Sequence, residues 1–224
     1  MRKKKNHHFE TKVIHAGQKS DPTTGAVMTP IVLASTFEQS SPGVHKGYDY
    51  SRSINPTREA FENCIADLEN GYKGYGFSSG VAAISACVEL LSPGDHIIAM
   101  DDLYGGSVRL FNEIKSLSQG IEISYVDMTD TNNIKNAIKA STKMIFVETP
   151  TNPLLKIADL SKIAKLAKKE KILTVCDNTF ASPFNQKPIN DGIDIVIHSA
   201  TKYLGGHSDS VSYTHLTLPT NPEV

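Results

Sequence analysis

The sequence has little of what several classes of protein need. Its three cysteines include no C-x-x-C pair, which argues against a zinc ribbon or a thioredoxin-like site. Lysine plus arginine (23) nearly balances aspartate plus glutamate (24), which argues against a polyphosphate-binding surface. No uncharged apolar stretch approaches the roughly 18 residues of a membrane span. We therefore expect a soluble cytoplasmic protein that binds neither membrane nor nucleic acid.

Several common site motifs are also missing. No G-x-G-x-x-G follows an expected strand, and no P-loop, H-E-x-x-H or G-x-S-x-G motif occurs. His198 stands almost alone near the expected site, and an isolated histidine is more often structural than a metal ligand, so no metal site is expected. The basic start, residues 1–5, has no apolar segment after it and is interpreted as a frayed tail rather than a secretory signal or a nucleic-acid arm.

The pattern of what is present predicts an α/β fold. Residues 1–55 lack periodicity and contain several prolines and glycines, which predicts an irregular N-terminal arm. A helix then begins at Pro56, with Asn55 as its N-cap, and is expected to end at Gly71. Beyond it, apolar runs alternate with amphipathic helices. Strands are expected at 96–100, 121–126, 144–147, 172–176 and 193–197, and helices at 79–91, 107–118, 131–140 and 159–169. This alternation indicates a mostly parallel central sheet flanked by helices.

Polar side chains follow each of these apolar runs. Ligands of such sheets bind beyond the carboxyl ends of the strands, so these side chains are expected to converge. Lys202 follows the last run, where partial desolvation would lower its pKa and suit it to bind a carbonyl carbon. Asp177 could pair with a protonated ring nitrogen, and Tyr104 could stack on a flat ring. Ser79, Gly80 and Val81 at a helix start offer N–H groups to a phosphate.

Together these segments resemble one family, the pyridoxal-phosphate enzymes of cysteine and methionine metabolism. The resemblance covers residues from about 15 to 209. Its motifs are Tyr50-Ser51-Arg52, Asn55-Pro56-Thr57-Arg58, Phe77-Ser78-Ser79-Gly80, Asp102-Leu103-Tyr104-Gly105-Gly106, Glu148-Thr149-Pro150-Thr151-Asn152-Pro153, Asp177-Asn178-Thr179-Phe180 and His198-Ser199-Ala200-Thr201-Lys202-Tyr203. Each motif alone is moderately specific, whereas their occurrence in this order is highly specific.

The resemblance implies pyridoxal 5'-phosphate as cofactor and a role for each matched residue. Lys202 would hold the cofactor covalently and move protons on the substrate, and Asp177 would pair with the ring nitrogen. Tyr104 would stack on the ring, and Asn152 would lie beside the ring hydroxyl and the substrate carboxylate. The phosphate would be held by Ser79, Gly80, Val81, Ser199 and Thr201. Tyr50 and Arg52 would reach a neighbouring subunit's phosphate in a homotetramer. The residues expected to take part in catalysis are Lys202, Tyr104 and Tyr50. Glu148 is interpreted as a structural support.

Within the family, segments 40–52 and 100–107 look most like the branch that cleaves cystathionine by γ-elimination. The γ-synthase branch, which joins cysteine to an O-acylhomoserine, stays a near alternative, and the β-lyase branch a further one. Outside the family, a regulatory protein on a degraded enzyme fold predicts loss of Lys202 or Asp177, yet both are present. A purely structural module would not need these polar side chains.

The resemblance stops at Asp209. Residues 210–224 look like sequence read through from an adapter and are interpreted as a non-native tail. The expected organisation is therefore an arm at 1–55 that contacts another subunit, an incomplete cofactor-binding domain at 56–209, and this tail. We expect a missing sheet strand with an unpaired edge, an absent C-terminal domain with the arginine that binds the substrate carboxylate, and no turnover of cystathionine by this chain alone. We also expect a cis proline bond between Thr149 and Pro153, to aim Asn152.

Overall fold

The computed structural model describes residues 7–207 and 214–218. The chain forms two compact units, one up to Leu68 and one from Glu69 onward. The division falls near the end of helix α2 (Pro56–Glu69), whereas the sequence places its boundary at residue 55. The role of the first segment as an inter-subunit arm stays a prediction.

The first unit is largely irregular, as the arm pattern predicts. Its regular elements are α1 (Phe9–His15), the short strands β1 (Gln39–Ser41) and β2 (Val44–His45), and α2. Asn55 caps α2, since its Oδ1 accepts the Thr57 N–H at 2.9 Å. The loop after α1 packs closely on α2: a Cβ at Gly17 would lie 2.3 Å from the Ala60 carbonyl oxygen. The predicted end at Gly71 is corrected by one residue, because Asn70 (φ 59°) takes the left-handed conformation that ends helices.

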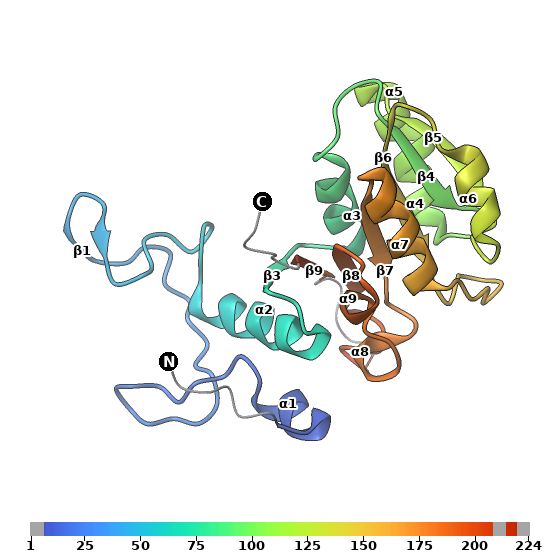
Figure 1. The fold of residues 1–224 in the computed structure, drawn as a ribbon. Coiled ribbons are helices and arrows are strands. Elements are labelled where there is room, and N and C mark those ends of the chain that lie inside the picture. The colour runs from blue at the N-terminus through green and yellow to red at the C-terminus, as the bar shows by residue number, and fades with distance from the viewer. Residues whose placement is uncertain (1–6, 208–213, 219–224) are drawn as a thin grey trace. The chain divides into compact units, whose positions relative to one another are not determined.

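The second unit is built on a seven-stranded sheet with the order β3-β9-β8-β7-β6-β4-β5 (Figure 1). The five strands from β8 to β5 are parallel, and β9 is antiparallel to both of its neighbours. The strands are β3 (Lys73–Gly76), β4 (His96–Met100), β5 (Glu122–Val126), β6 (Thr142–Glu148), β7 (Leu173–Asp177), β8 (Ile195–Ser199) and β9 (Thr214–Leu218). The α/β fold with a mostly parallel sheet is therefore confirmed.

Helices cover the sheet and bury its central strands. They are α3 (Gly80–Val88), α4 (Gly105–Arg109), a π-helical turn η1 (Leu110–Lys115), α5 (Ser116–Gln119), α6 (Thr131–Ala137), α7 (Leu160–Glu170), α8 (Ser182–Asn185) and α9 (Pro188–Asp191). All five residues of β4 are fully buried, including side chains on both sides of the strand. Successive strand residues point to opposite faces, so both faces of the sheet are covered. The core joins these strands to the inner faces of α3 and α7.

Two strands were not expected from the sequence. β3 contains two glycines, so its pattern is not that of a strand, yet it pairs with β9 from Lys73 opposite Leu218 to Gly76 opposite His215. β9 itself lies in the predicted tail and pairs with β8, so the prediction of an unpaired edge beside β8 is wrong. The rest of the predicted tail, 210–213 and 219–224, lies outside the described residues. In the part of the chain that is described, no helix is long and apolar enough to cross a membrane.

Candidate active site

A cavity of about 250 Å³ lies in the second unit, at the carboxyl ends of its parallel strands. This volume is near the lower end of small-molecule pockets, which suits one ring with its substituents. Nine of the eleven residues that the sequence singles out line it: Ser79, Gly80, Val81, Tyr104, Asn152, Asp177, Ser199, Thr201 and Lys202. They come from five separate segments, four of which end or follow strands of the sheet as the strand-end argument predicts. Ile84, Glu148, Thr179 and Phe180 complete the lining.

One side of the cavity is the start of helix α3. The Ser79 hydroxyl oxygen accepts the Ala82 N–H at 3.1 Å and so caps the helix. The N–H groups of Gly80 and Val81 lie in the first turn, where an α-helix has no internal partner for them. Such N–H groups, at the positive end of the helix dipole, favour an anion. Ser199 also lines the cavity, and its backbone N–H donates to the Thr179 hydroxyl at 2.8 Å.

Two carboxyl groups lie next to each other in the lining of the cavity. Glu148 and Asp177 are register partners at the ends of the parallel strands β6 and β7, and both are buried. Burial raises the pKa of Glu148 to about 8, and the charge of Asp177 adds to this increase. Burial also raises the pKa of Asp177, but the hydrogen bonds from Thr179 and the nearby His198 act in the opposite direction. Asp177 is therefore the carboxyl group that is better able to stay ionised.

Glu148 also connects two walls of the cavity. Its Oε2 accepts the backbone N–H of Tyr104 at 2.9 Å. This bond fixes the chain where it enters α4 and leaves the Tyr104 side chain 46% exposed at the cavity. The supporting role that the sequence assigns to Glu148 agrees with this geometry. The predicted cis bond is confirmed, since both the Thr149–Pro150 and Asn152–Pro153 bonds are cis.

Lys202 lines the cavity but is not desolvated as the sequence predicts. It lies in the turn that follows β8 and is exposed. The expectation that the Lys202 amine is buried is therefore wrong. Lys202 and Asp177 do line the same cavity, as expected. A cofactor ring between them would remove water from the amine.

Tyr50 and Arg52 belong to the first unit and do not line the cavity. They lie against each other, since the Arg52 Nη2 donates to the Tyr50 hydroxyl at 2.5 Å and the guanidinium lies 5.1 Å from the ring centre. The backbone around them is held by a bridge between Tyr50 and Thr36. Their predicted action across a subunit interface stays a prediction.

The sequence did not reveal the buried polar cluster behind Asp177. Glu69, Asn178 and His198 are all fully buried. One Glu69 oxygen accepts the His198 Nε2–H at 2.6 Å and the Asn178 amide at 2.8 Å. This buried contact agrees with the prediction that His198 is structural. Its partner could not be found from sequence, because 129 positions separate the two residues.

The cavity defines a class of protein: an α/β fold that places an anion-binding helix start, an exposed aromatic ring, a buried acid and a lysine around one small space. Pyridoxal phosphate has a phosphate, a flat ring, a basic ring nitrogen and an aldehyde. Each of these groups has a chemical counterpart in the lining, and the buried Asp177 carboxylate in particular has no lysine or arginine ion pair among the described residues. The residues present therefore fit this cofactor.

The chain belongs to the Cys/Met metabolism PLP-dependent enzyme family, whose model matches residues 10–216. It is 59% identical over 207 residues to a cystathionine beta-lyase of Coxiella burnetii, covering 92% of this chain and 54% of that protein. It is 47% identical over 209 residues to a probable cystathionine gamma-synthase of Herpetosiphon aurantiacus, covering 93% and 65%. The crystal structure of a cystathionine gamma-lyase from Lactobacillus plantarum, complexed with L-serine, superposes with a TM-score of 0.92 at 49% identity, over 96% of this chain and 55% of that one. The chain thus spans about half to two thirds of the length of these relatives.

Proposed function

We propose that the protein to which this chain belongs is a pyridoxal-phosphate-dependent lyase that cleaves a C–S bond of L-cystathionine, by γ-elimination. The observation that carries the proposal is the single cavity shared by the Lys202 amine, the buried Asp177 carboxylate and the Tyr104 ring. A β-lyase is the second candidate, supported by the 59% identity to the Coxiella protein. A γ-synthase is the third, supported by the Herpetosiphon relative.

Each residue of the cavity has a task in this proposal. When bound, the cofactor supplies an electron sink that makes a carbanion beside the substrate nitrogen accessible. The Asp177 carboxylate would keep the ring nitrogen protonated, and the Tyr104 ring would stack on the cofactor ring. Asn152 would hydrogen-bond the ring hydroxyl and the substrate carboxylate. The phosphate would be bound by the backbone N–H groups and hydroxyls of Ser79, Gly80, Val81, Ser199 and Thr201.

Lys202 would have two tasks. Its amine would anchor the cofactor until an amino-acid substrate displaces it. Once released, the amine would accept a proton from the substrate's α carbon and deliver protons at the carbons that react next. The long, unbranched side chain of a lysine can reach several adjacent carbons, whereas a carboxyl group on a buried strand end could not. The exposure of Lys202 is compatible with this movement.

Tyr50 and Arg52 would complete the site across a subunit interface. Their mutual hydrogen bond presents a phenol and a guanidinium together, and arginine suits bidentate recognition of a phosphate. On this basis we propose a homotetramer with this pair acting on a neighbouring subunit's cofactor. Mixing a protein that lacks Lys202 with one that lacks Arg52 tests this, since only a shared site can restore activity in the mixture.

Cofactor attachment is tested by reduction with borohydride. The chain is incubated with pyridoxal phosphate, reduced, digested and analysed by mass spectrometry. We expect the peptide that contains Lys202 to gain the mass of the reduced cofactor. Lys202→Ala should lose the modification, and Lys169→Ala, at a lysine whose side chain is 82% exposed, should keep it. Equal labelling of several lysines without preference for Lys202 would contradict the proposal.

The bond that is cleaved is tested through the products, using a protein that carries this chain at the length of its relatives. Cleavage of L-cystathionine on its four-carbon side, with water, yields cysteine, 2-oxobutanoate and ammonia. Cleavage on its three-carbon side yields homocysteine, pyruvate and ammonia. We expect 2-oxobutanoate to predominate. Predominant pyruvate would favour the β-lyase, and turnover only with an O-acylhomoserine and cysteine would favour the γ-synthase.

A further inference from the structure

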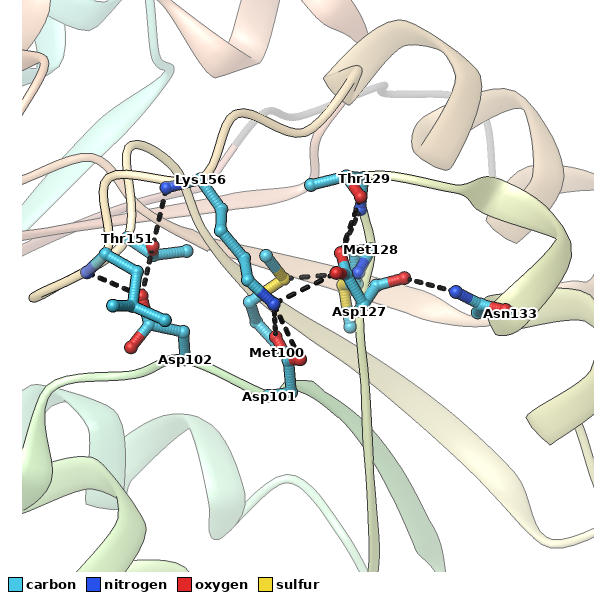
Figure 2. A network of polar contacts seen from close by, with 10 residues as sticks. Met100, Asp101, Asp102, Asp127, Met128, Thr129, Asn133, Thr151 and Lys156 are labelled. Carbon is cyan, nitrogen blue, oxygen red and sulfur yellow. Dashed lines mark hydrogen bonds and ion pairs between the residues drawn. The ribbon is translucent and has the colours of Figure 1, made fainter.

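A network of polar contacts links the loop that carries Asn152 to the end of strand β4 (Figure 2). Asp102 Oδ2 accepts two hydrogen bonds from this loop, one from the Thr151 hydroxyl and one from the Leu154 N–H at 2.9 Å. These donors stand on either side of Asn152 in the chain. The carboxylate of Asp102 therefore binds the loop on both sides of Asn152, the residue that lines the cavity.

Other hydrogen bonds hold the ends of the loop: the Gln186 amide donates to the Thr149 carbonyl at 2.9 Å, the Ala158 N–H to the Thr149 hydroxyl at 3.0 Å, and the Leu155 N–H to the Thr151 carbonyl at 3.2 Å. Pro150 and Pro153 have no N–H group, so only a few backbone donors can tie the loop down. Thr151 is fully buried, and its hydroxyl oxygen also accepts the Lys156 N–H at 2.8 Å. The Thr151 N–H in turn donates to the Lys156 carbonyl at 3.1 Å. Thr151 is thus the inner support of the loop, and Asp102 is the support that reaches it from another strand.

The neighbouring carboxylate has a different partner. Asp101 pairs with the Lys156 amine at 2.7 Å, and Asp127 at the end of β5 pairs with the same amine at 2.9 Å (Figure 2). These ion pairs are partly exposed and are expected to contribute little. Asp102 has no lysine or arginine ion pair among the described residues, so its charge is directed at the neutral donors of the loop.

Asp102 also stands two residues before Tyr104. The Tyr104 N–H is itself fixed by Glu148, at the end of β6 from which the Asn152 loop starts. The two segments on which Asn152 and Tyr104 lie are therefore tied together twice, once through Glu148 and once through Asp102.

We propose that Asp102 is a positioning residue: its carboxylate clamps the loop on both sides of Asn152 and so sets where Asn152 stands relative to Tyr104. The clamp is a property of the chain itself, while its effect on the cofactor rests on the proposed function. Loss of the carboxylate frees the loop, and a mobile Asn152 binds the ring hydroxyl less well. Affinity for pyridoxal phosphate then falls without any change in the residues that touch it.

The experiment compares Asp102→Ala, Asp102→Asn and a matched control, Asp101→Ala, by amide hydrogen exchange without cofactor and by titration with pyridoxal phosphate. In Asp102→Ala we expect the Leu154 amide to exchange at least about tenfold faster and the cofactor dissociation constant to rise about tenfold. Asp102→Asn keeps an acceptor oxygen and should restore most of both. Asp101→Ala should match the unmodified chain at Leu154 and in affinity.

The outcomes distinguish failure of the clamp, or of its effect on the site, from failure of the proposed function. Unchanged exchange at Leu154 in Asp102→Ala, or equal effects of Asp101→Ala, would overturn the clamp. Faster exchange with unchanged cofactor affinity would overturn the effect of the clamp on the site. If the unmodified chain binds no pyridoxal phosphate, the proposed function fails, and the exchange measurement still decides whether Asp102 holds the loop.

Discussion

The buried cluster around Glu69 gives a sharp prediction on stability. Glu69 is the last residue of α2, and its side chain is fully buried, as are those of His198 and Asn178. In Glu69→Ala, the His198 Nε2–H and the Asn178 amide lose the oxygen that they share. Stripping a buried donor of its acceptor costs about 1–3 kcal/mol, and two buried donors lose their acceptor in this variant. We expect the free energy of unfolding to fall by about 3–5 kcal/mol.

This loss is measured by urea and thermal unfolding. For a domain of this size it corresponds to a decrease in Tm of about 6–20 °C, at about 2–4 °C for each kcal/mol. Glu69→Gln keeps one acceptor oxygen and the shape of the side chain, so its loss should be smaller. Glu170→Ala is the matched control, because Glu170 also ends a helix but its side chain is 39% exposed. Its effect should stay within about 0.5 kcal/mol. A loss below about 1 kcal/mol in Glu69→Ala would refute the reasoning.

Three more predictions follow from burial and close contacts. In the folded chain the pKa of Glu148 is raised to about 8, above the value of about 4.5 in the unfolded chain. The free energy of unfolding is therefore largest below about pH 4.5, where Glu148 is protonated in both states, and it decreases as the pH rises from about 4.5 to 8. Urea unfolding should therefore show Glu148→Gln gaining stability over the unmodified chain across this range and no further above it; a constant difference would contradict this. A Cβ at Gly106 would lie 2.4 Å from the Tyr104 ring, so Gly106→Ala should displace the ring and weaken cofactor binding in a titration, while Gly105→Ala, which meets only one side-chain atom at 3.6 Å, should not. The Cys176 thiol is fully buried and its pKa is raised well above normal, so iodoacetamide at pH 8 should label it only after unfolding; rapid labelling of the folded chain would show that the core opens.

The parallel strands could be predicted because burial on both faces leaves a plain signal. Runs such as 96–100 and 144–147 contain almost only apolar residues, and they form the neighbouring strands β4 and β6, which pair in parallel. The convergence of polar residues could be predicted from the direction of the strands. In a parallel sheet, the loops that follow the strands all leave from the same edge. Six of the nine predicted site residues that line the cavity follow expected strands in this way, whereas Ser79, Gly80 and Val81 lie at a helix start.

What could not be predicted depends on partners far away in the sequence. β3 has a weak strand pattern and forms because β9 pairs with it, some 140 positions later. The exposure of Lys202 depends on the residues packed around its turn, which the local sequence pattern does not reveal. The segment 105–119 could be predicted as helical, but not its π-helical turn, since the spacing of apolar residues does not distinguish the two helix types over one turn.

The two neighbouring carboxyl groups that line the cavity lower the stability of the fold. Their presence is therefore better explained by a function at this edge of the sheet than by folding. Glu148 and Asp177 are buried side by side as register partners, which raises the pKa of both and opposes folding near neutral pH. Hydrogen bonds from Tyr104 to one carboxyl group and from Thr179 to the other offset only part of this cost. Two apolar residues at these positions would make the unit more stable, but they could neither fix Tyr104 nor hold a cationic ring nitrogen. If the proposed function is right, saturating pyridoxal phosphate should stabilise the unmodified chain more than Asp177→Asn, because only the carboxylate gains a charged partner on binding. Equal stabilisation of the two proteins would mean that the buried acid has a purely structural role.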